Sequence, residues 1–141
     1  METIIGKEFP KKVIPLIDSA KRSINTVVFD WRWYPNDAGC PTQLFNQALV
    51  RASRRGVKIQ AVVNNDSVVN ILNSVGILAR HVTLKNLIHA KLMIIDDSVV
   101  VIGSHNYTQN AFSVNQEISV ILPIDETMRD FFNFFQSLWQ A

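Results

Sequence analysis

The sequence has one cysteine, few charged residues and no long hydrophobic run. A single cysteine, Cys40, cannot form an intrachain disulfide and excludes a multi-cysteine zinc site. No apolar stretch approaches the roughly 18 residues that span a bilayer, so we expect no transmembrane helix and no stable membrane association. Residues 1–9 lack the apolar core of a secretory signal. We therefore expect a cytoplasmic protein, or a periplasmic or secreted one if a signal has been removed.

The size and hydrophobic content are typical of one globular domain. The chain has 141 residues, of which 48% are hydrophobic, and this excludes disorder of the low-hydrophobicity kind. We expect a single domain over residues 1–141. Charged residues make up 18%, against about 25% in typical domains. A small domain short of surface charge is consistent with a surface covered by a second chain.

The charge that is present is unevenly distributed along the chain. Residues 1–91 hold 13 Lys and Arg and 6 Asp and Glu, whereas residues 92–141 hold one basic and 6 acidic residues. The first part therefore carries +7 and the second −5, for the net +2 of the whole chain. The basic part is where we expect a polyanion to bind, although solvated helix faces would give the same pattern.

Hydrophobic periodicity and turn residues predict alternating helices and strands. Helices are expected over 11–22, over 42–56 with an inward stripe of Leu44, Phe45, Ala48, Leu49 and Ala52, over 66–76, and over 128–139. Strands are expected over 24–31, 57–63, 77–84 and 116–122, with a hairpin of 87–95 and 98–102 around Asp96 and Asp97. This order predicts an α/β domain with a mixed β-sheet sandwiched between helices.

Four polar residues near the hairpin stand out. On a strand, His89 and Lys91 would project from the same face, and the apolar run 92–95 that follows indicates a central strand. Ser104 and Asn106 are also two residues apart, where the hairpin returns. We therefore expect an imidazole, an ammonium, a hydroxyl and a carboxamide to converge on one point.

These groups suit phosphoryl transfer. A neutral imidazole near pH 7 can act as a nucleophile or as an acid and base. Lys91 and Asn106 offer donors to the non-bridging oxygens of a phosphodiester, where charge builds up in the transition state. No clustered carboxylates or further histidines form a cage for Mg²⁺ or Zn²⁺. We therefore expect a reaction without a metal or another cofactor.

The same stretch resembles the signature of the phospholipase D superfamily, His-x-Lys-x₄-Asp-x₆-Gly-Ser-x-Asn. Every defined position is present: His89, Lys91, Asp96, Gly103, Ser104 and Asn106. Glu117 matches the acidic residue that follows the signature in the family, and the helix ending at 54–57 before a strand matches its layout. The resemblance implies a phospholipase D/nuclease-like fold.

The resemblance also implies a two-fold homodimer. Members of the superfamily use two such motifs, whereas this chain has one copy and no room for another. It therefore resembles the short bacterial nucleases in which two chains assemble one active site, and a two-fold axis would bring His89 of each chain to the other. One His89 would attack phosphorus to give a phosphohistidine, while the other protonates the leaving oxygen and later activates water.

The other motif residues receive roles from the same resemblance. Lys91 and Asn106 would hold the equatorial oxygens, and Ser104 would support the phosphate or neighbouring side chains. Glu117 is expected to accept a hydrogen bond from the imidazole, as a triad acid does. We expect structural roles for Asp96, at the predicted turn, and for Gly103.

Two further groups of residues have weaker signals. Trp31, Arg32 and Trp33 end the first predicted strand, where α/β proteins tend to bind ligands. They would either stack on bases and contact phosphate or cap the core, and the sequence leaves both open. His81 and His105 lack partners at a meaningful spacing, so we expect them to be structural.

Three functions fit these features. The first is a metal-independent endonuclease that hydrolyses DNA, with RNA as a further candidate substrate, and has little sequence preference, since no recognition domain is evident. The second is a phospholipid or cardiolipin phosphodiesterase, for which residues 31–34 would form an apolar lip. The third is a catalytically silent nucleic-acid-binding module, against which the intact motif argues.

Overall fold

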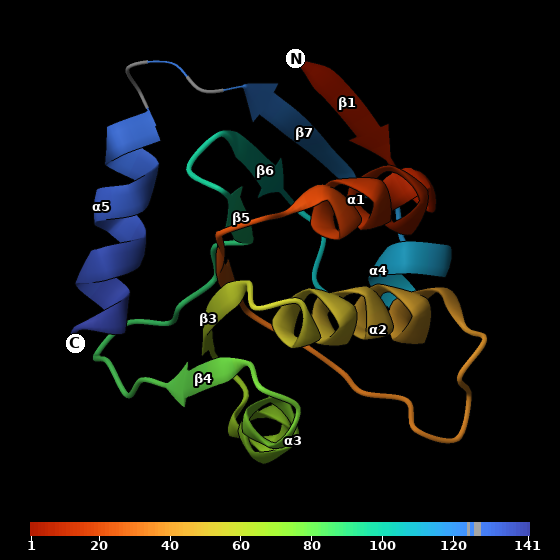
Figure 1. Ribbon diagram of the computed structural model, residues 1–141, viewed down its shortest axis with the longest axis horizontal. Helices are drawn as coiled ribbons and strands as arrows, with labels where there is room; N and C mark the ends of the chain where they lie inside the picture. Colours follow the sequence, from red (N-terminus) through yellow and green to blue (C-terminus); the bar gives the residue numbers. More distant parts are fainter. Residues whose placement is uncertain (124, 126–127) are drawn as a thin grey trace.

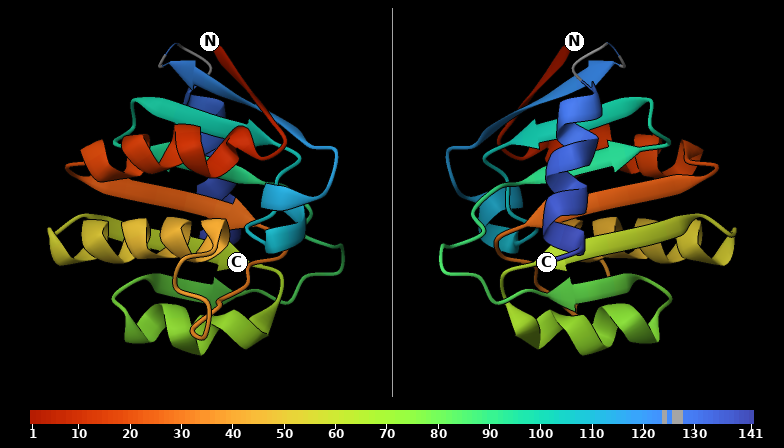
Figure 2. Two further views of the ribbon diagram at one scale, coloured as in Figure 1. Left: turned by 90° about the vertical axis from the view of Figure 1, so that its right-hand side faces the viewer. Right: turned by 90° about the vertical axis from the view of Figure 1, so that its left-hand side faces the viewer.

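The computed structural model describes residues 1–123, 125 and 128–141, and these form a seven-stranded sheet with helices on both faces (Figure 1). Helices α1, α2 and α4 cover one face and α5 covers the other, while α3 lies beside the edge strand β4 (Figures 1 and 2). The helices are α1 (Glu8–Ser19), α2 (Pro41–Arg54), the 3₁₀ helix η1 (Asp66–Val68), α3 (Val69–Ser74), α4 (Gln109–Ser113) and α5 (Met128–Trp139). The strands are β1 (Glu2–Ile5), β2 (Ser23–Val28), β3 (Lys58–Val63), β4 (Leu78–His81), β5 (Leu92–Ile95), β6 (Val99–Gly103) and β7 (Ile118–Pro123).

The sheet is mixed, with the order β1-β7-β6-β5-β2-β3-β4. Strands β2, β3 and β4 are parallel, because α2 and α3 return the chain between them, and the remaining neighbours are antiparallel. The predicted α/β fold with a mixed sheet between helices is therefore confirmed. The edge strand β1 and the short helix α4 were not predicted, because four or five residues give too little periodicity to recognise.

Each face of the sheet has its own hydrophobic core. The larger one lies under α1, α2 and α4 and includes Val13, Phe45 and Phe112. The smaller one lies under α5, where Phe135 is fully buried. The other predicted inward residues of α5 are partly buried against it: Phe131, Phe132, Leu138 and Trp139. No helix in the described ranges is both long and apolar enough to cross a membrane.

Helix α1 begins three residues before the predicted position. The Glu8 carboxylate accepts a hydrogen bond from the backbone N–H of Ile5, at 2.9 Å, and so holds the turn that starts the helix. Pro10 then lies in the first turn, where proline is tolerated. Pro15, expected near the start, lies inside the helix instead.

Strand β5 begins at Leu92, so His89 and Lys91 precede the strand that was expected to contain them. The segments that follow its neighbours β2 and β6 join each other through an isolated parallel bridge between Trp31 and Tyr107. The backbone N–H of Tyr107 donates to the carbonyl of Asp30, at 3.0 Å. Because the segments after β2 and β6 close over the start of β5, the residues before Leu92 have no place in the sheet.

The β5–β6 hairpin turns at Asp96 and Asp97, as predicted. Both residues have positive φ, 53° and 50°, and they are the central residues of a β-turn closed by a hydrogen bond from the backbone N–H of Ser98 to the carbonyl of Ile95, at 2.9 Å. The Asp96 carboxylate accepts hydrogen bonds from the backbone N–H groups of Lys21, Arg22 and Ser23, at 2.7–3.2 Å. Partial burial opposes ionisation of Asp96, but these three donors outweigh it and lower the pKa of the carboxyl. Asp96 therefore ties the hairpin to the start of β2.

Replacing Asp96 by asparagine is expected to destabilise the fold by about 1–2 kcal/mol near pH 7, since charge-assisted hydrogen bonds are lost. The pKa of Asp96 is lower in the folded protein than in the unfolded chain, where it is near 4. The ionised carboxylate therefore stabilises the folded protein above about pH 4, and this contribution is lost as pH falls through the folded-state pKa. The difference from wild type, measured by urea unfolding, should therefore shrink below about pH 4. Asp97→Asn is the control, because Asp97 also has positive φ but no side-chain bond among the described residues. Equal losses in both variants would contradict the assignment.

Candidate active site

The predicted site residues gather at one end of the sheet. β2 and β6 end there, and His89 and Lys91 enter β5 there. Asn106 follows β6, and Glu117 precedes β7 at the same end. Side chains distant in the sequence thus meet outside the strand ends, where open α/β sheets bind ligands.

His89 and Lys91 form a hydrogen-bonded pair above Phe29. The ammonium Nζ of Lys91 lies 3.1 Å from Nδ1 and 3.3 Å from Nε2 of His89 and donates to the imidazole. The Phe29 ring centroid lies 5.0 Å from that of His89 and 5.7 Å from Lys91 Nζ. The pair thus packs against the Phe29 ring. Phe29 was not predicted as a site residue, because in the sequence a phenylalanine at a strand end is indistinguishable from a core residue.

The ammonium of Lys91 is partly desolvated. Burial lowers the pKa of its ammonium, and the negative charge of Glu117 opposes this effect. Lys91 is half-buried, whereas His89 is exposed. The site therefore has an accessible imidazole beside a partly desolvated cation, which suits binding of an anionic group.

Glu117 holds the Ser104 loop. Its carboxylate accepts hydrogen bonds from the hydroxyl of Ser104 and from Nδ2 of Asn115, the latter at 3.1 Å. The Ser104 hydroxyl in turn accepts from the backbone N–H of Ile118, at 3.0 Å. The expected hydrogen bond from His89 to Glu117 is not formed among the described residues, because Lys91 is the partner of the imidazole and Ser104 that of the carboxylate.

Gly103 allows β6 to approach β7 closely before the Ser104 loop. A Cβ atom at this position would lie 2.3 Å from the Cα and Oγ of Ser119 and 2.5 Å from the carbonyl oxygen of Ile118. Two of these three atoms, the Ser119 Cα and the Ile118 carbonyl oxygen, belong to the backbone of β7. A side chain at position 103 would therefore separate the strands that carry Ser104 and Glu117.

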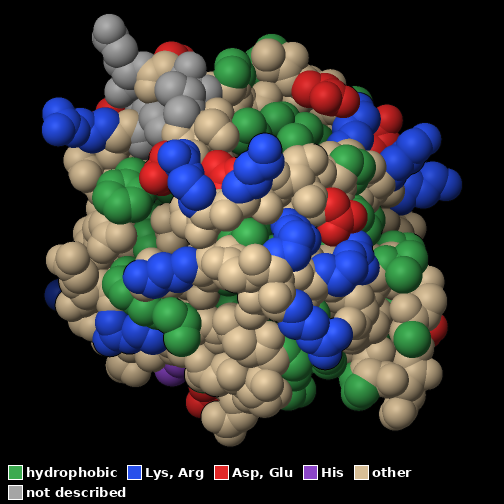
Figure 3. All heavy atoms as spheres, in the orientation of Figure 1, with side chains coloured by type: hydrophobic (Ala, Val, Ile, Leu, Met, Phe, Trp, Pro, Cys, Tyr) green, Lys and Arg blue, Asp and Glu red, His purple; other side chains and the backbone are tan. Residues whose placement is uncertain are grey.

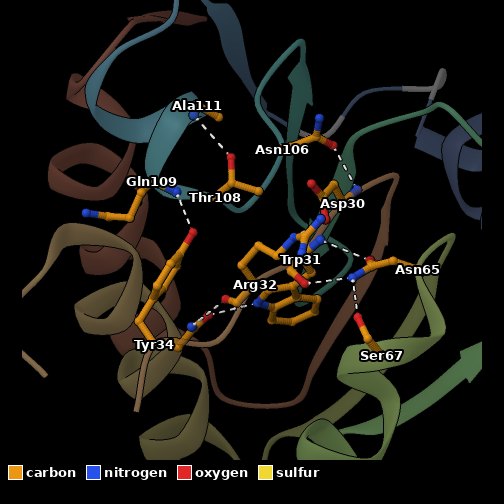
Figure 4. A network of polar contacts seen from close by, with 11 residues as sticks. Asp30, Trp31, Arg32, Tyr34, Asn65, Ser67, Asn106, Thr108, Gln109 and Ala111 are labelled. Carbon is orange, nitrogen blue, oxygen red and sulfur yellow. Dashed lines mark hydrogen bonds and ion pairs between the residues drawn. The ribbon is translucent and has the colours of Figure 1, made fainter. Parts of the chain in front are cut away.

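The amide nitrogen of Asn106 has no hydrogen-bond partner within residues 1–123, 125 and 128–141. Its Oδ1 accepts a hydrogen bond from the backbone N–H of Asp30, at 3.0 Å, and its amide nitrogen points away from this contact (Figure 4). With the oxygen occupied, the two N–H groups of Nδ2 are available to a ligand. Asn106 is thus set up to donate to an oxygen anion.

Trp31 lies in the core and cannot stack on a substrate base, which corrects one of the two interpretations left open. It is 0% exposed, and its indole N–H donates to Oδ1 of Asn46 at 2.8 Å (Figure 4). Asn65 accepts from its backbone N–H and donates to its carbonyl, at 3.1 and 2.9 Å. Arg32 is exposed and pairs with Asp30 at 2.8 Å, and Trp33 is half-buried at the surface.

Two buried polar residues of α2 fix the 31–34 segment through hydrogen bonds. Gln43 and Asn46 are 2% and 0% exposed, and Gln43 Oε1 accepts from the backbone N–H of Tyr34 at 2.8 Å. Leu44, predicted to face inward, is 48% exposed instead. The burial of these two amides was not predicted. Two polar residues three positions apart beside an apolar helical stripe are a pattern that could have indicated it.

A polar pocket of about 550 Å³ opens beside Asn106. Side chains that can donate and accept hydrogen bonds, together with two aromatic rings, line it: Asp30, Arg32, Trp33, Tyr34, Asn106, Thr108, Gln109, Asn110 and Asn115. The Tyr34 hydroxyl accepts from the backbone N–H of Gln109 at 3.0 Å and so fixes one wall (Figure 4). Its mixture of amides, a guanidinium and aromatic rings suits a sugar and base more than an acyl chain.

A second pocket, of about 530 Å³, lies on the other side of His89 and is apolar. Its walls include Leu84, Leu87, Ile88, Phe134 and Leu138. Leu87 is 63% exposed and Phe134 44% exposed. The two pockets offer different chemistry on the two sides of the motif.

His105 lies in the core, as expected for a structural histidine. Nε2 donates to the carbonyl of Gly6 at 2.8 Å, so Nδ1 accepts from the Ser119 hydroxyl at 2.7 Å. Burial lowers the pKa of this imidazole and so favours its neutral form. The imidazole of the exposed His81 has one hydrogen-bond partner among the described residues, the Val63 carbonyl. No group of three or more His, Cys, Asp or Glu in the described ranges is arranged to hold a metal ion.

Comparison with known proteins gives consistent matches. A family model described as "Cardiolipin synthase, PLD-like domain" matches residues 13–139. The human "Mitochondrial cardiolipin hydrolase" is 32% identical over 141 residues, covering 96% of this chain and 52% of that protein. The chain thus spans about half the length of this relative.

Two solved structures are similar over nearly the whole chain. Nuc from Salmonella typhimurium, described as a phospholipase D family member, has a TM-score of 0.80 and 25% identity over 98% of this chain and 93% of that one. NucT from Helicobacter pylori has a TM-score of 0.78 and 20% identity over 99% and 94%. Given the family match along most of its length, the chain belongs to the phospholipase D superfamily.

Proposed function

We propose that this protein is a metal-independent endonuclease that hydrolyses DNA, with RNA as a further candidate substrate. The observation that carries the proposal is the polar pocket beside Asn106, which offers amides, Arg32 and two aromatic rings next to the phosphate-binding groups. A nucleoside flanking the scissile phosphate would find hydrogen-bond partners and ring surfaces there. No element of the described chain has the form of a sequence-reading module, which fits low sequence preference.

In the proposed mechanism, a nitrogen of His89 attacks phosphorus. The new N–P bond forms as the bond from phosphorus to the leaving oxygen breaks, and His89 of a second subunit gives that oxygen its proton. Water then attacks phosphorus and breaks the N–P bond, while the second imidazole takes the water proton. Lys91 and Asn106 donate to the equatorial oxygens during both steps, since their donors face the site.

The proposal requires a homodimer. The described chain supplies one exposed motif histidine, whereas the reaction uses two. A two-fold axis beside His89 would bring the two imidazoles onto opposite sides of one phosphate. Light scattering should therefore give a mass of about twice the 16.0 kDa of the chain.

The proposed function is tested by incubating the protein with supercoiled plasmid and with single-stranded DNA and RNA in excess EDTA. We expect nicking and cutting to persist in EDTA, because no step uses a metal ion. Cutting that stops with EDTA and returns with Mg²⁺ would contradict the mechanism. A folded dimer that cuts none of these polymers would contradict the choice of substrate and would favour a lipid substrate or a silent binding module.

A lipid phosphodiesterase is the second candidate, and the apolar pocket beside His89 favours it. Exposed Leu87 and Phe134 could contact acyl chains, and the human relative is a cardiolipin hydrolase by name. Hydrolysis of cardiolipin in mixed vesicles distinguishes the two. A lipid enzyme should lose vesicle hydrolysis when Leu87 is replaced by glutamate, whereas a nuclease should retain plasmid cutting in that variant.

A further inference from the structure

Basic side chains are concentrated at the end of the sheet opposite to the candidate active site. Figure 3 looks onto the end at which β2 and β3 begin, and Lys and Arg side chains are spread across this face. Lys21 lies between α1 and β2, Arg54 is the last residue of α2 and Lys58 is the first of β3. All three are exposed, and we call them the basic cluster.

The side chains of several neighbouring arginines have hydrogen-bond partners, whereas those of the cluster have none among the described residues. Arg51 pairs with Asp18 at 3.0 Å, and Arg55 donates to the carbonyls at the end of α1. Arg22 donates to the carbonyl of Asp96. Such contacts at helix ends account for basic residues without any ligand. The side chains of the basic cluster, by contrast, have no ionic or hydrogen-bond partner among the described residues.

The cluster is too far from His89 to bind the scissile phosphate. β2 and β3 each have six residues and run from the cluster to the active-site end. At about 3.3 Å per residue, the two ends lie roughly 20 Å apart. The positive charge predicted to bind the substrate is therefore largely separated from the catalytic groups.

We propose that the basic cluster binds the sugar–phosphate backbone of a nucleic acid at a distance from the bond that is cut. The proposal deepens the proposed nuclease function and rests on it for the identity of the polymer. A flexible single strand can curve around the domain and contact both ends, whereas a stiff duplex can lie along the cluster alone. A bilayer cannot contact both ends, because a membrane lying on the cluster would leave His89 on the side facing away from it.

The apolar residues support the choice of nucleic acid over membrane. The exposed Leu84, Leu87 and Phe134 lie beside His89 or on α5 by its pocket, and not beside the basic cluster. A membrane-binding surface usually combines basic residues with apolar side chains that insert between the lipids. Leu78, at the start of β4, is exposed at the same end of the sheet as the cluster. The three residues by the His89 pocket form the larger exposed apolar group, and their distance from the cluster is that expected for a surface that follows phosphates.

The test compares two double variants with the same loss of charge, both made in the His89→Ala background so that binding is measured without cleavage. Arg54→Gln/Lys58→Gln removes two cluster residues, and Lys11→Gln/Arg129→Gln removes two exposed basic residues outside it. The probe is a duplex of about 40 base pairs, titrated at several salt concentrations. Each lost phosphate contact should reduce the slope of log K against log salt by about 0.9. We expect a reduction of about 2 and roughly tenfold weaker binding near 0.1 M salt for the cluster variant, with a much smaller change for the control.

Three outcomes would overturn the inference. They are equal changes in the two double variants, an unchanged slope in the cluster variant, and a loss of affinity for anionic vesicles but not for the duplex. When the same double substitutions are made in the protein that retains His89, hydrolysis of bis(p-nitrophenyl) phosphate should be the same for both variants, because so small a substrate cannot reach the cluster. Cluster-dependent duplex binding without any plasmid cutting would instead contradict the proposed nuclease function and leave the binding surface standing.

Discussion

Replacing His89 by alanine is expected to reduce phosphodiester hydrolysis by about 10⁴-fold or more while leaving the dimer intact. The substitution removes both the nucleophile and the general acid, since each is the same residue on a different subunit. His89 is exposed, so its loss leaves no cavity in the core. The measurement is the rate of plasmid nicking in EDTA, with mass by light scattering and circular dichroism as checks. His81→Ala, which removes another exposed histidine, should retain nearly full activity.

Mixing the two proteins tests whether the site is shared. When wild type and His89→Ala exchange subunits at equal concentration, only about a quarter of the dimers have both histidines. The rate should then fall to about half of that given by the wild-type protein alone in the mixture. An unchanged rate would show that each chain works independently. Substantial hydrolysis by His89→Ala alone would rule out the phosphohistidine.

Replacing Lys91 by alanine is expected to reduce kcat by about 10²–10³-fold, which corresponds to roughly 2.7–4 kcal/mol of lost transition-state stabilisation. The ammonium contacts the imidazole and is the cation nearest to it among the described contacts. Lys11→Ala, at an exposed position of α1, is the matched control. A change in KM alone would indicate that Lys91 binds the ground state and the transition state equally well.

The lowered pKa of Lys91 adds a pH dependence to this prediction. The ammonium is the active form, so activity should decline as pH rises through a pKa below the ordinary 10.5. Glu117→Gln removes the charge that partly restores this pKa, and the alkaline limb should move to still lower pH. An alkaline limb that is unchanged in Glu117→Gln would mean that Lys91 does not cause it.

The motif could be predicted from the sequence because its residues lie at fixed spacing around one hairpin. The turn at Asp96 and Asp97 follows from local chemistry alone, since two residues that tolerate positive φ separate two apolar runs. The polar lining of the site could not be derived in the same way. Trp31 has the composition of a ligand-binding surface, yet a single hydrogen bond to Asn46, on a helix 15 residues away, shows why it belongs to the core.

The position of His89 outside the sheet was also beyond sequence reasoning. An apolar run predicts where a strand can form, but hydrogen-bond partners decide where it ends. β5 begins only at Leu92 because Trp31 and Tyr107, 76 residues apart in the chain, pair across the position before it. Contacts between such distant segments leave no periodicity in either. The same limit applies to Glu117. The family resemblance implied a hydrogen bond from His89, whereas the carboxylate accepts one from Ser104.

The catalytic groups and the walls of the polar pocket come from different parts of the chain. The histidine and lysine come from a short segment fixed between strand ends, whereas the polar pocket is walled by the 30–34 segment and α4, both outside the sheet. Segments of this kind tolerate changes in length and sequence. Selectivity can therefore drift while the reaction stays the same, and grafting residues 32–40 from a relative is a route to redirect the enzyme without rebuilding its catalytic frame.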